Sequence, residues 1–255
     1  MQFKDFRPYE PGDDIRHMSW SVTARTGKPT IKVYEQEREL DVVLVVDTSS
    51  STLFGNTRKR KLDMYGEIAA IIGLSALGAG DNFGQIIFND TVTSFLRPNH
   101  RPEQVRVALT HLFSTDMEQK RSNLASALNF TSKSLSHRSL VIILSDFWVE
   151  DFEAELGMAS RRHECILVHG YDQLEMGSGV CDLSEIQDPE SGEIYILDGN
   201  TQHTKTLLQR AHWSHQLHLE ETANRTNSDY LSLSVEDDYV QRLVLFFQRR
   251  GFTRL

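Results

Sequence analysis

Short apolar runs alternate with amphipathic stretches along most of this chain. Three runs are rich in β-branched residues and hold few polar ones, a pattern typical of strands buried on both faces of a parallel sheet. These runs cover residues 40–46, 140–144 and 165–168. Between the first two, apolar side chains recur at helical spacing from Leu62 to Ala76. Strands that alternate with helices in this way predict an α/β fold, with a doubly wound, mostly parallel sheet that helices cover on both faces.

The remaining elements are predicted from the periodicity of apolar residues, which differs between helices and strands, and from the glycine, proline and capping residues between them. Helices are expected over residues 62–79, 102–113, 123–135, 152–162, 205–226 and 238–249. Ser122 is the expected cap of the third of these helices. Further strands are expected over residues 30–34, 83–88, 91–96, 193–197 and 230–233.

Two parts of the chain differ in this pattern. Residues 1–39 are polar and irregular apart from one edge strand, so we expect an N-terminal arm. Residues 40–255 carry the alternating pattern and are expected to form one domain. Within that domain, the glycines and acids of residues 171–200 predict loops and an inserted hairpin.

Composition narrows the classes of function. The chain has 255 residues, with 27 Lys and Arg against 36 Asp and Glu and a formal net charge of −9. This balance disfavours general binding to nucleic acid, which depends on a basic face. The local basic run over residues 58–61 is interpreted as a solvated loop that leads into a helix. Neither of the two cysteines lies in a CxxC pair, so thiolate metal sites and redox sites lack support.

The pattern also predicts a soluble, cytoplasmic protein without a membrane span. The longest uninterrupted apolar runs are far shorter than the ~20 residues that a membrane helix needs. The first residues of the chain, MQFKDFRPYE, contain no apolar stretch and so do not resemble a secretory signal.

Two acids follow predicted central strands. Asp47 ends the first strand and is followed by Ser49 and Ser51, while Asp146 comes after the run over residues 140–144. The carboxyl ends of parallel strands form the ligand-binding edge of such a sheet, so these carboxylates should converge if their strands are neighbours at the switch in strand order. A cation would resolve the repulsion of two buried acids. Carboxylate and hydroxyl oxygens suit Mg²⁺ or Mn²⁺ rather than zinc or copper. The alternative is that each acid only caps the helix after it.

In this arrangement Asp47, Ser49 and Ser51 resemble the metal-ion-dependent adhesion site of von Willebrand A domains. The resemblance implies two further ligands from later loops. Ser122 matches the later hydroxyl, where those domains more often have threonine, and Asp146 matches the last acid.

A second resemblance is more specific and covers nearly the whole chain. The segment RPYEPGDDIRH over residues 7–17 is followed by Trp20 and by TARTG over residues 23–27. Together with residues 37–39, Gly80-Asp81 and residues 144–147, this pattern resembles the signature of the DUF58 family. Ser19 stands where that family usually has an acid. The resemblance implies a von Willebrand A-like fold and no established enzymatic activity. It also implies a partner, because family members are typically encoded beside MoxR-type AAA+ ATPases and are thought to act with them in complex assembly or maturation.

The expected function is therefore a non-enzymatic, metal-dependent protein-binding module. Mg²⁺ takes octahedral oxygen ligands and keeps several waters. We expect Asp47 and Asp146 to bind it partly through water and the serines to bind it directly, which leaves at least one position open. An aspartate or glutamate of the partner, a MoxR-type ATPase or its client, would fill that position.

A receiver-like phosphoryl-acceptor domain that uses Asp47 is the main alternative. Receivers also place an aspartate at the end of a buried strand, but they add an acidic pair and a late lysine that are not clear in this sequence. A serine hydrolase is a third hypothesis, but the chain has no GxSxG elbow, and His169 is the one histidine directly after a predicted core strand. His212, His215 and His218 are interpreted as part of a half-exposed amphipathic helix.

Overall fold

The structure is a computed structural model that describes residues 2–35, 39–53, 55–56, 59–115, 121–177, 183–187, 194–198 and 201–251. The chain divides into two compact units, Met1–Glu39 and Leu40–Leu255. The boundary falls where the polar N-terminal pattern gives way to the alternating one.

The N-terminal unit is more regular than its sequence suggests. Its elements are the antiparallel strands β1 and β2, a 3-10 turn and helix α1, which span Gln2–Pro8, Thr30–Glu35, Ile15–His17 and Trp20–Thr26. The sequence pattern predicts only β2 and misses the rest. The unit is held by bonds between distant backbone groups, such as Ser19 N–H to the Thr30 carbonyl at 2.8 Å. Side-chain periodicity carries no signal for such bonds.

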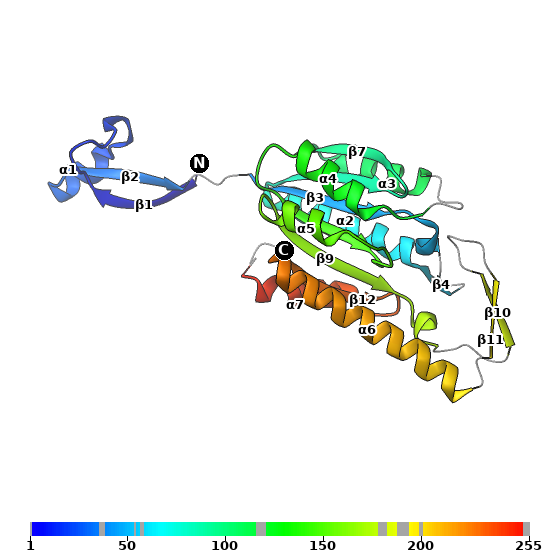
Figure 1. Ribbon diagram of the computed structural model, residues 1–255. Coiled ribbons are helices and arrows are strands. Elements are labelled where there is room, and N and C mark those ends of the chain that lie inside the picture. The colour runs from blue at the N-terminus through cyan, green and yellow to red at the C-terminus, as the bar shows by residue number, and fades with distance from the viewer. Residues whose placement is uncertain are drawn as a thin grey trace. The chain divides into compact units, whose positions relative to one another are not determined.

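The larger unit is organised around a six-stranded sheet in the order β12-β9-β8-β3-β6-β7 (Figure 1). In chain order these strands span Asp41–Asp47 (β3), Asn82–Phe88 (β6), Val92–Asn99 (β7), Leu140–Ser145 (β8), Glu164–Tyr171 (β9) and Asp229–Ser234 (β12). Neighbouring strands are parallel except for β7, the antiparallel edge strand. From β3 the chain continues to β6 and β7 on one side of the sheet. It then returns to β8, on the other side of β3, and continues outward to β9 and β12. The sheet is therefore doubly wound, as the sequence predicts, and its order reverses between β3 and β8.

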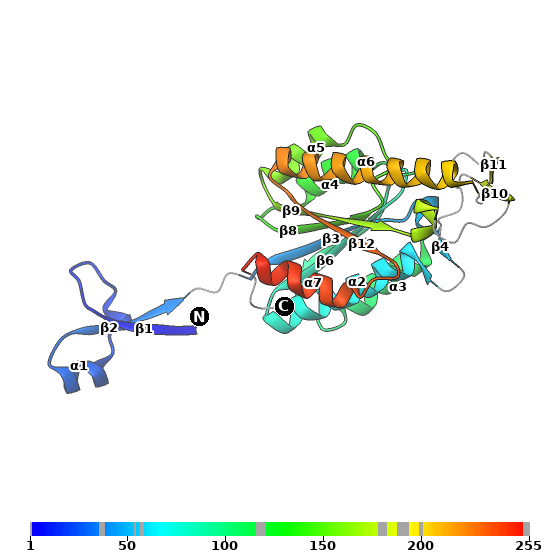
Figure 2. The ribbon, with the colours of Figure 1, turned by 90° about the horizontal axis from the view of Figure 1, so that it is seen from below.

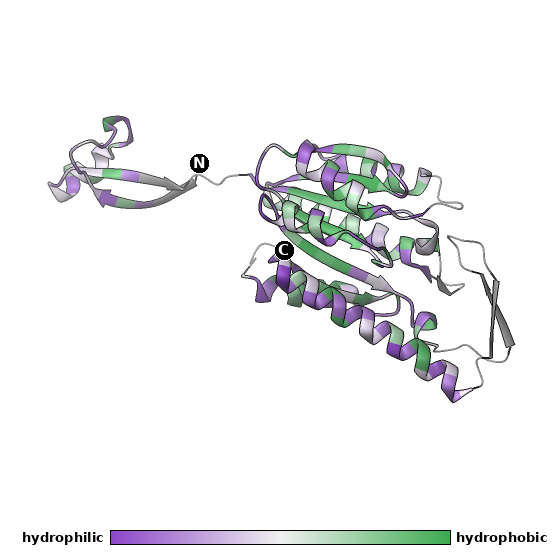
Figure 3. Cartoon of the chain, in the orientation of Figure 1, coloured by the Kyte–Doolittle hydropathy of each residue, from purple (hydrophilic) through white to green (hydrophobic). Residues whose placement is uncertain are grey.

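Helices cover both faces of this sheet (Figure 2). On one face lie α2 (Lys61–Ala79), α3 (Gln104–Ser114) and α7 (Tyr239–Arg249). On the other lie α4 (Leu124–Ser134), α5 (Glu153–Ser160) and α6 (Gln202–Thr226). Successive residues of β3 point to opposite cores, with Leu44 in the first and Val43 in the second. Both faces of the central strands are therefore apolar, which explains why their sequences show no polar alternation. In Figure 3 these strands are coloured mostly as hydrophobic.

Two short antiparallel pairs complete the larger unit. Strands β10 (Leu183–Gln187) and β11 (Ile194–Asp198) form a hairpin within the stretch where the sequence predicts one. Glu193, the first residue of the predicted strand, lies outside the described residues. Strands β4 (Gly55–Asn56) and β5 (Lys59–Arg60) lead into α2 and were not predicted, because two-residue strands have no period to detect.

Helix α2 is the one helix among the described residues that is long and apolar enough, by length and composition, to cross a membrane. Its apolar window has a mean hydropathy of 1.3, and 50% of that window is buried inside the folded unit. The uninterrupted apolar runs of the sequence are too short to indicate a membrane span, so α2 was not predicted as a candidate. In this fold its buried residues, among them Leu62 and Tyr65, pack on the sheet.

The contact between α2 and β9 leaves no room for a side chain at Gly170. A Cβ atom at that position would lie 2.5 Å from the Tyr65 hydroxyl and 2.8 Å from the terminal methyl carbon of Met64. Both of these side chains are fully buried. The close approach of the helix to the strand therefore requires glycine here.

Gly170→Ala is expected to lower the free energy of unfolding by about 1–3 kcal/mol, because the added methyl group overpacks a closed core. Gly78→Ala is the matched control, since nothing lies within 4 Å of a Cβ added there. That substitution in α2 should instead raise stability by about 0.5–1 kcal/mol. Urea denaturation of the two variants measures both effects, and a neutral or stabilising result for Gly170→Ala would contradict the packing account.

Candidate metal centre

The first half of the site is the turn after β3, which begins at Asp47. Thr48 bonds twice to the Phe88 carbonyl at the end of β6, through its backbone N–H at 2.8 Å and its hydroxyl at 2.9 Å. Thr52 donates its N–H and its hydroxyl to the Ser49 carbonyl at 3.0 and 2.7 Å. These bonds close a short 3-10 turn and hold the loop that carries the two serines of the motif.

The fully buried Asp47 carboxylate accepts hydrogen bonds at both of its oxygens. Oδ1 accepts from the backbone N–H of Ser49 at 2.9 Å. Oδ2 accepts from the hydroxyls of Ser122 and Ser145, each at 2.7 Å. Ser122 precedes α4 and Ser145 ends β8, so separate segments of the chain meet at this carboxylate. These donors are all neutral.

The second half of the site is the sharp turn after β8. Phe147 has a φ of 56°, a left-handed conformation that is costly for a bulky side chain. The Phe147 N–H donates to the Ser145 hydroxyl at 3.0 Å, and the Trp148 N–H donates to Asp146 Oδ1 at 3.4 Å. Burial of the Phe147 side chain holds the turn in place. The Asp146 carboxylate then lies in hydrogen-bond contact with the Ser51 side chain.

The structure brings all the predicted ligands to one edge of the sheet. The hydroxyl oxygens of Ser49 and Ser51 lie 3.1 Å apart. Because Ser49 contacts Asp47 and Ser51 contacts Asp146, the hydroxyls link the two carboxylates. The acids end adjacent parallel strands, β3 and β8, at the point where the strand order reverses. This is the geometry on which the metal-site prediction depends.

The alternative role of the two acids as helix caps finds no support. The N-cap residues are Arg60 for α2 and Phe152 for α5. Asn123, not Ser122, caps α4 by accepting from the Ser126 N–H at 3.0 Å. This corrects the predicted cap and leaves the Ser122 hydroxyl available to Asp47.

Two charged residues of the site were missed in the sequence. Lys61 is only 1% exposed, and its Nζ lies 2.7 Å from Asp146 Oδ2 and 2.6 Å from Glu175 Oε1. Glu175 belongs to a 3-10 turn after β9. The interpretation of residues 58–61 as a solvated run is therefore wrong for Lys61. Its spacing was the available signal, because Lys61 stands four residues before Tyr65 on the buried stripe of α2.

The pKa values of the two aspartates are shifted in opposite directions. Burial, followed by the negative charge of Asp146, raises the pKa of Asp47. Burial would also raise the pKa of Asp146, but the charge and hydrogen bond of Lys61 outweigh it and hold that pKa below its usual value. Burial raises the pKa of Glu175 as well, against the opposing charge of Lys61. Lys61 stays protonated, because Asp146 and Glu175 raise its pKa despite its burial.

A further contact that the sequence did not reveal comes from α6. His215 Nε2 lies 2.9 Å from the carbonyl oxygen of Asp146, and its ring stacks on Trp148 with centroids 3.9 Å apart. Trp148 is 50% exposed beside the site. The prediction of a half-exposed amphipathic helix agrees with α6, in which His212 is buried and His218 is exposed.

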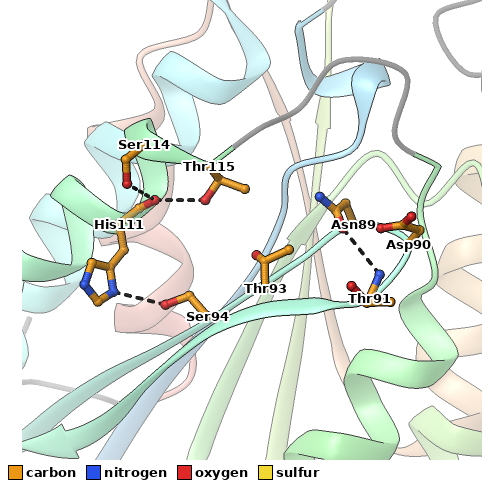
Figure 4. Close-up of a pocket in the computed structure, with 8 residues that line it drawn as sticks. All are labelled: Asn89, Asp90, Thr91, Thr93, Ser94, His111, Ser114 and Thr115. Atoms are coloured by element: carbon orange, nitrogen blue, oxygen red, sulfur yellow. Dashed lines mark hydrogen bonds between the residues drawn. The ribbon is translucent and has the colours of Figure 1, made fainter.

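A polar cavity of about 440 Å³ lies on the same edge of the sheet, beyond the end of β6 (Figure 4). Its lining is Asn89, Asp90, Thr91, Thr93, Ser94, His111, Ser114 and Thr115. Ser94 bonds the His111 ring, and the hydroxyls of Ser114 and Thr115 donate to the His111 carbonyl. These polar groups bond one another, so we assign them no ligand.

The donor set fits a hard divalent cation. Two carboxylates and three hydroxyls are oxygen ligands of the kind that Mg²⁺ and Mn²⁺ take. In the described part of the chain, no group of three or more His, Cys, Asp or Glu side chains is arranged to hold a metal ion. A cation at this edge would therefore depend on the serine hydroxyls as much as on the two acids.

In chelator at neutral pH, Asp47→Asn and Asp146→Asn should shift stability in opposite directions. Asp47→Asn removes a buried charge that only neutral donors bond, and should raise the free energy of unfolding by about 1 kcal/mol. Asp146→Asn removes one of the two partners of the buried Lys61 charge, and should lower the free energy of unfolding by about 3 kcal/mol. Urea denaturation measures both values, and shifts of the same sign would contradict this electrostatic account.

The difference in free energy of unfolding between Asp47→Asn and the natural chain should also become smaller as the pH falls. The raised pKa of Asp47 means that the folded protein takes up this proton before the unfolded chain does. The charge penalty is therefore fully present above the folded-state pKa, declines as the pH falls below that pKa, and is gone below the lower pKa of the unfolded chain. The same denaturation series at several pH values checks this trend.

Two solved structures from Bacteroides share this fold at low sequence identity, and two others are less similar to it. BatB from Bacteroides thetaiotaomicron matches with a TM-score of 0.55 and 14% identity, over 83% of this chain and 98% of that chain. An aerotolerance-related membrane protein from Bacteroides fragilis matches with a TM-score of 0.53 and 14% identity, over 82% and 97%. The von Willebrand A domain of SpRpn10 has a TM-score of 0.46 and 9% identity, over 81% and 94%. The proximal thread matrix protein 1 of the mussel byssus, described with a zinc-occupied MIDAS motif, has a TM-score of 0.41 and 13% identity, over 54% and 39%.

The prediction of a cytoplasmic protein is wrong in the light of these findings. The Bacteroides fragilis protein of the same fold is described as a membrane protein. Helix α2 also meets the length and composition of a membrane span.

A curated relative and a family profile extend the likeness over most of the chain. "Uncharacterized protein Rv1480" from Mycobacterium tuberculosis is 28% identical over 264 residues, which cover 96% of this chain and 78% of that protein. The profile described as "Protein of unknown function DUF58" matches residues 5–218, a range that includes every predicted metal ligand. The chain therefore belongs to the DUF58 family, with a von Willebrand A-like fold in its larger unit.

Proposed function

We propose that this protein is a protein-binding module that depends on a divalent metal ion and has no catalytic activity of its own. One observation carries the proposal: Asp47 and Asp146 end adjacent strands and are linked through serine hydroxyls, with Ser122 also bonded to Asp47. The von Willebrand A-like fold supports the general form of this proposal, a metal-dependent interaction module.

The five predicted ligands, Asp47, Ser49, Ser51, Ser122 and Asp146, would hold Mg²⁺ or Mn²⁺. When bound, the ion supplies a positive charge that attracts a carboxylate from another molecule. The serine hydroxyls are neutral ligands and leave that charge undiminished. Mg²⁺ takes six oxygen ligands, one more than these five side chains supply with one oxygen each, so water or a partner oxygen would complete the set.

The partner that suits this site presents an aspartate or a glutamate. Trp148, held by its stack on His215, adds exposed aromatic surface directly beside Asp146, and tryptophan often dominates the energy of protein interfaces. Membership of the DUF58 family supports a MoxR-type AAA+ ATPase or its client as the partner, in the assembly or maturation of a complex.

A phosphoryl-acceptor role for Asp47 has less support. The lysine of the site bonds Asp146 rather than Asp47. A hydrolase is also poorly supported, because the two serine hydroxyls of the motif bond each other and His169 bonds the Tyr230 hydroxyl.

The natural chain is expected to bind one Mg²⁺ or Mn²⁺ ion in isothermal titration calorimetry, and Asp47→Asn should weaken that binding by about tenfold or more. Asp151→Asn is the matched control. Asp151 is exposed and has a φ of 55°, a conformation that asparagine tolerates. This variant therefore loses the same charge at an exposed position five residues after Asp146, and should bind metal as the natural chain does. Equal metal affinity in the natural chain and in Asp47→Asn would sink the proposed site.

The partner is tested by affinity capture from cells that contain the natural protein, in Mg²⁺ and in EDTA. An AAA+ ATPase identified by mass spectrometry should be retained in Mg²⁺ by the natural chain and by Asp151→Asn. It should be lost in EDTA and lost with Asp47→Asn. Retention of the ATPase in EDTA, or with Asp47→Asn, would rule out metal-dependent binding of that partner.

A further inference from the structure

The buried ammonium group of Lys61 is the feature of the site that its proposed function does not explain. Nζ contacts Asp146 Oδ2 at 2.7 Å and Glu175 Oε1 at 2.6 Å, and the Lys61 side chain is 1% exposed. Asp146 is thus shared between Lys61 and the candidate metal position. Glu175 is not among the predicted ligands, and its second oxygen, Oε2, is buried without a hydrogen-bond partner among the described residues.

The charges in this cluster do not balance. Asp47, Asp146 and Glu175 contribute three negative charges when ionised, and Lys61 contributes one positive charge, which leaves a deficit of two. The electrostatic influence of Asp146 reaches both Asp47 and Glu175, so the four groups act as one cluster. A divalent cation supplies the two positive charges that the cluster lacks.

We infer that Lys61 is a built-in counter-ion and positioning residue of the metal centre, which holds Asp146 through Oδ2 and matches the charge of the site to one divalent ion. This inference rests on the proposed metal site and extends it to the residues that set its affinity. A lysine is not needed there to fill space, because an apolar side chain would suit the buried stripe that continues through Tyr65. A buried ion pair is also seldom a net gain over apolar packing. Its value would lie in the charge that it brings to Asp146.

The charge of Lys61 bears on both steps of partner binding. It reduces the negative charge that Asp146 can offer to the ion, so the natural site binds metal more weakly than its three acids would on their own. A bound ion that is less neutralised attracts a partner carboxylate more strongly. Lys61 thus lowers the affinity of the site for the metal and strengthens the attraction of the bound ion for the acidic partner.

The test is the order of Mn²⁺ affinities in calorimetry, measured on the full chain. Lys61→Met raises the negative charge of the cluster and should bind Mn²⁺ about tenfold more tightly or better, whereas Glu175→Gln lowers it and should bind about tenfold more weakly. The double variant Lys61→Met/Glu175→Gln keeps the natural net charge and should lie between the two single variants. Lys59→Met is the matched control, because Lys59 pairs with Glu67 instead, and its affinity should stay within about twofold of the natural value.

Thermal unfolding provides a readout that does not depend on a partner. Lys61→Met leaves Asp146 and Glu175 without their counter-ion, so it should melt at a lower temperature in EDTA and gain more from Mn²⁺ than the natural chain gains. A lysine with only a structural role would instead lower the melting temperature equally with and without the metal. Should Lys61→Met fail to fold, Glu175→Gln against the natural chain decides the question.

The outcomes separate this inference from the proposed function. Mn²⁺ affinities that are equal in the natural chain, Lys61→Met and Glu175→Gln overturn the role of Lys61 and leave the metal site standing. Absence of Mn²⁺ binding in every variant overturns both. The expected order of affinities together with partner capture that survives EDTA supports the role of Lys61 and removes only the partner-binding function.

Discussion

The burial of two carboxylates at one point of the sheet is the constraint around which this site is organised. Asp47 and Asp146 end neighbouring parallel strands, and each is at most 1% exposed. Like charges repel in such a place, and water cannot solvate them. The surrounding protein has to supply hydrogen bonds and positive charge instead. Most polar residues of the site, from the serine hydroxyls to Lys61, can be understood as meeting that requirement.

The two acids are stabilised by different kinds of group. Asp47 is bonded by hydroxyls and a backbone N–H, which are neutral, whereas Asp146 is bonded by an ammonium group. Charge is a far stronger influence than a neutral hydrogen bond in a buried place. The pKa of Asp47 is therefore raised by burial and by its neighbour, while that of Asp146 is lowered by Lys61 against the effect of burial. The negative charge without a fixed counter-ion consequently lies on the Asp47 side, beside Ser49 and Ser122.

The parts that could be predicted depend on local pattern and on the geometry of parallel sheets. Strands β3 and β8 are recognisable because both of their faces are buried, which removes polar residues from their sequences. Asp47 and Asp146 follow from this, since acids at the ends of parallel strands share an edge. The Ser122 contact was accessible only through the resemblance to an adhesion site, because this serine is 75 residues from Asp47 in the chain.

The residues that could not be predicted are those that compensate charge. Lys61 belongs to a run of basic residues, and such runs are usually exposed to solvent. Its burial depends on two acids that lie 85 and 114 residues away in the chain. Glu175 and His215 carry no motif, and each reaches the site from an element that packs there only in the finished fold. Asp47, Ser49 and Ser51, three of the five predicted ligands, lie within one turn, so a local motif can reveal them. The charge balance of a buried site depends on every charged group that packs around it, so it is a property of tertiary structure. The oxygen donors of the candidate site can therefore be predicted largely from its motif, whereas the charges that compensate them depend on contacts that only the folded chain reveals.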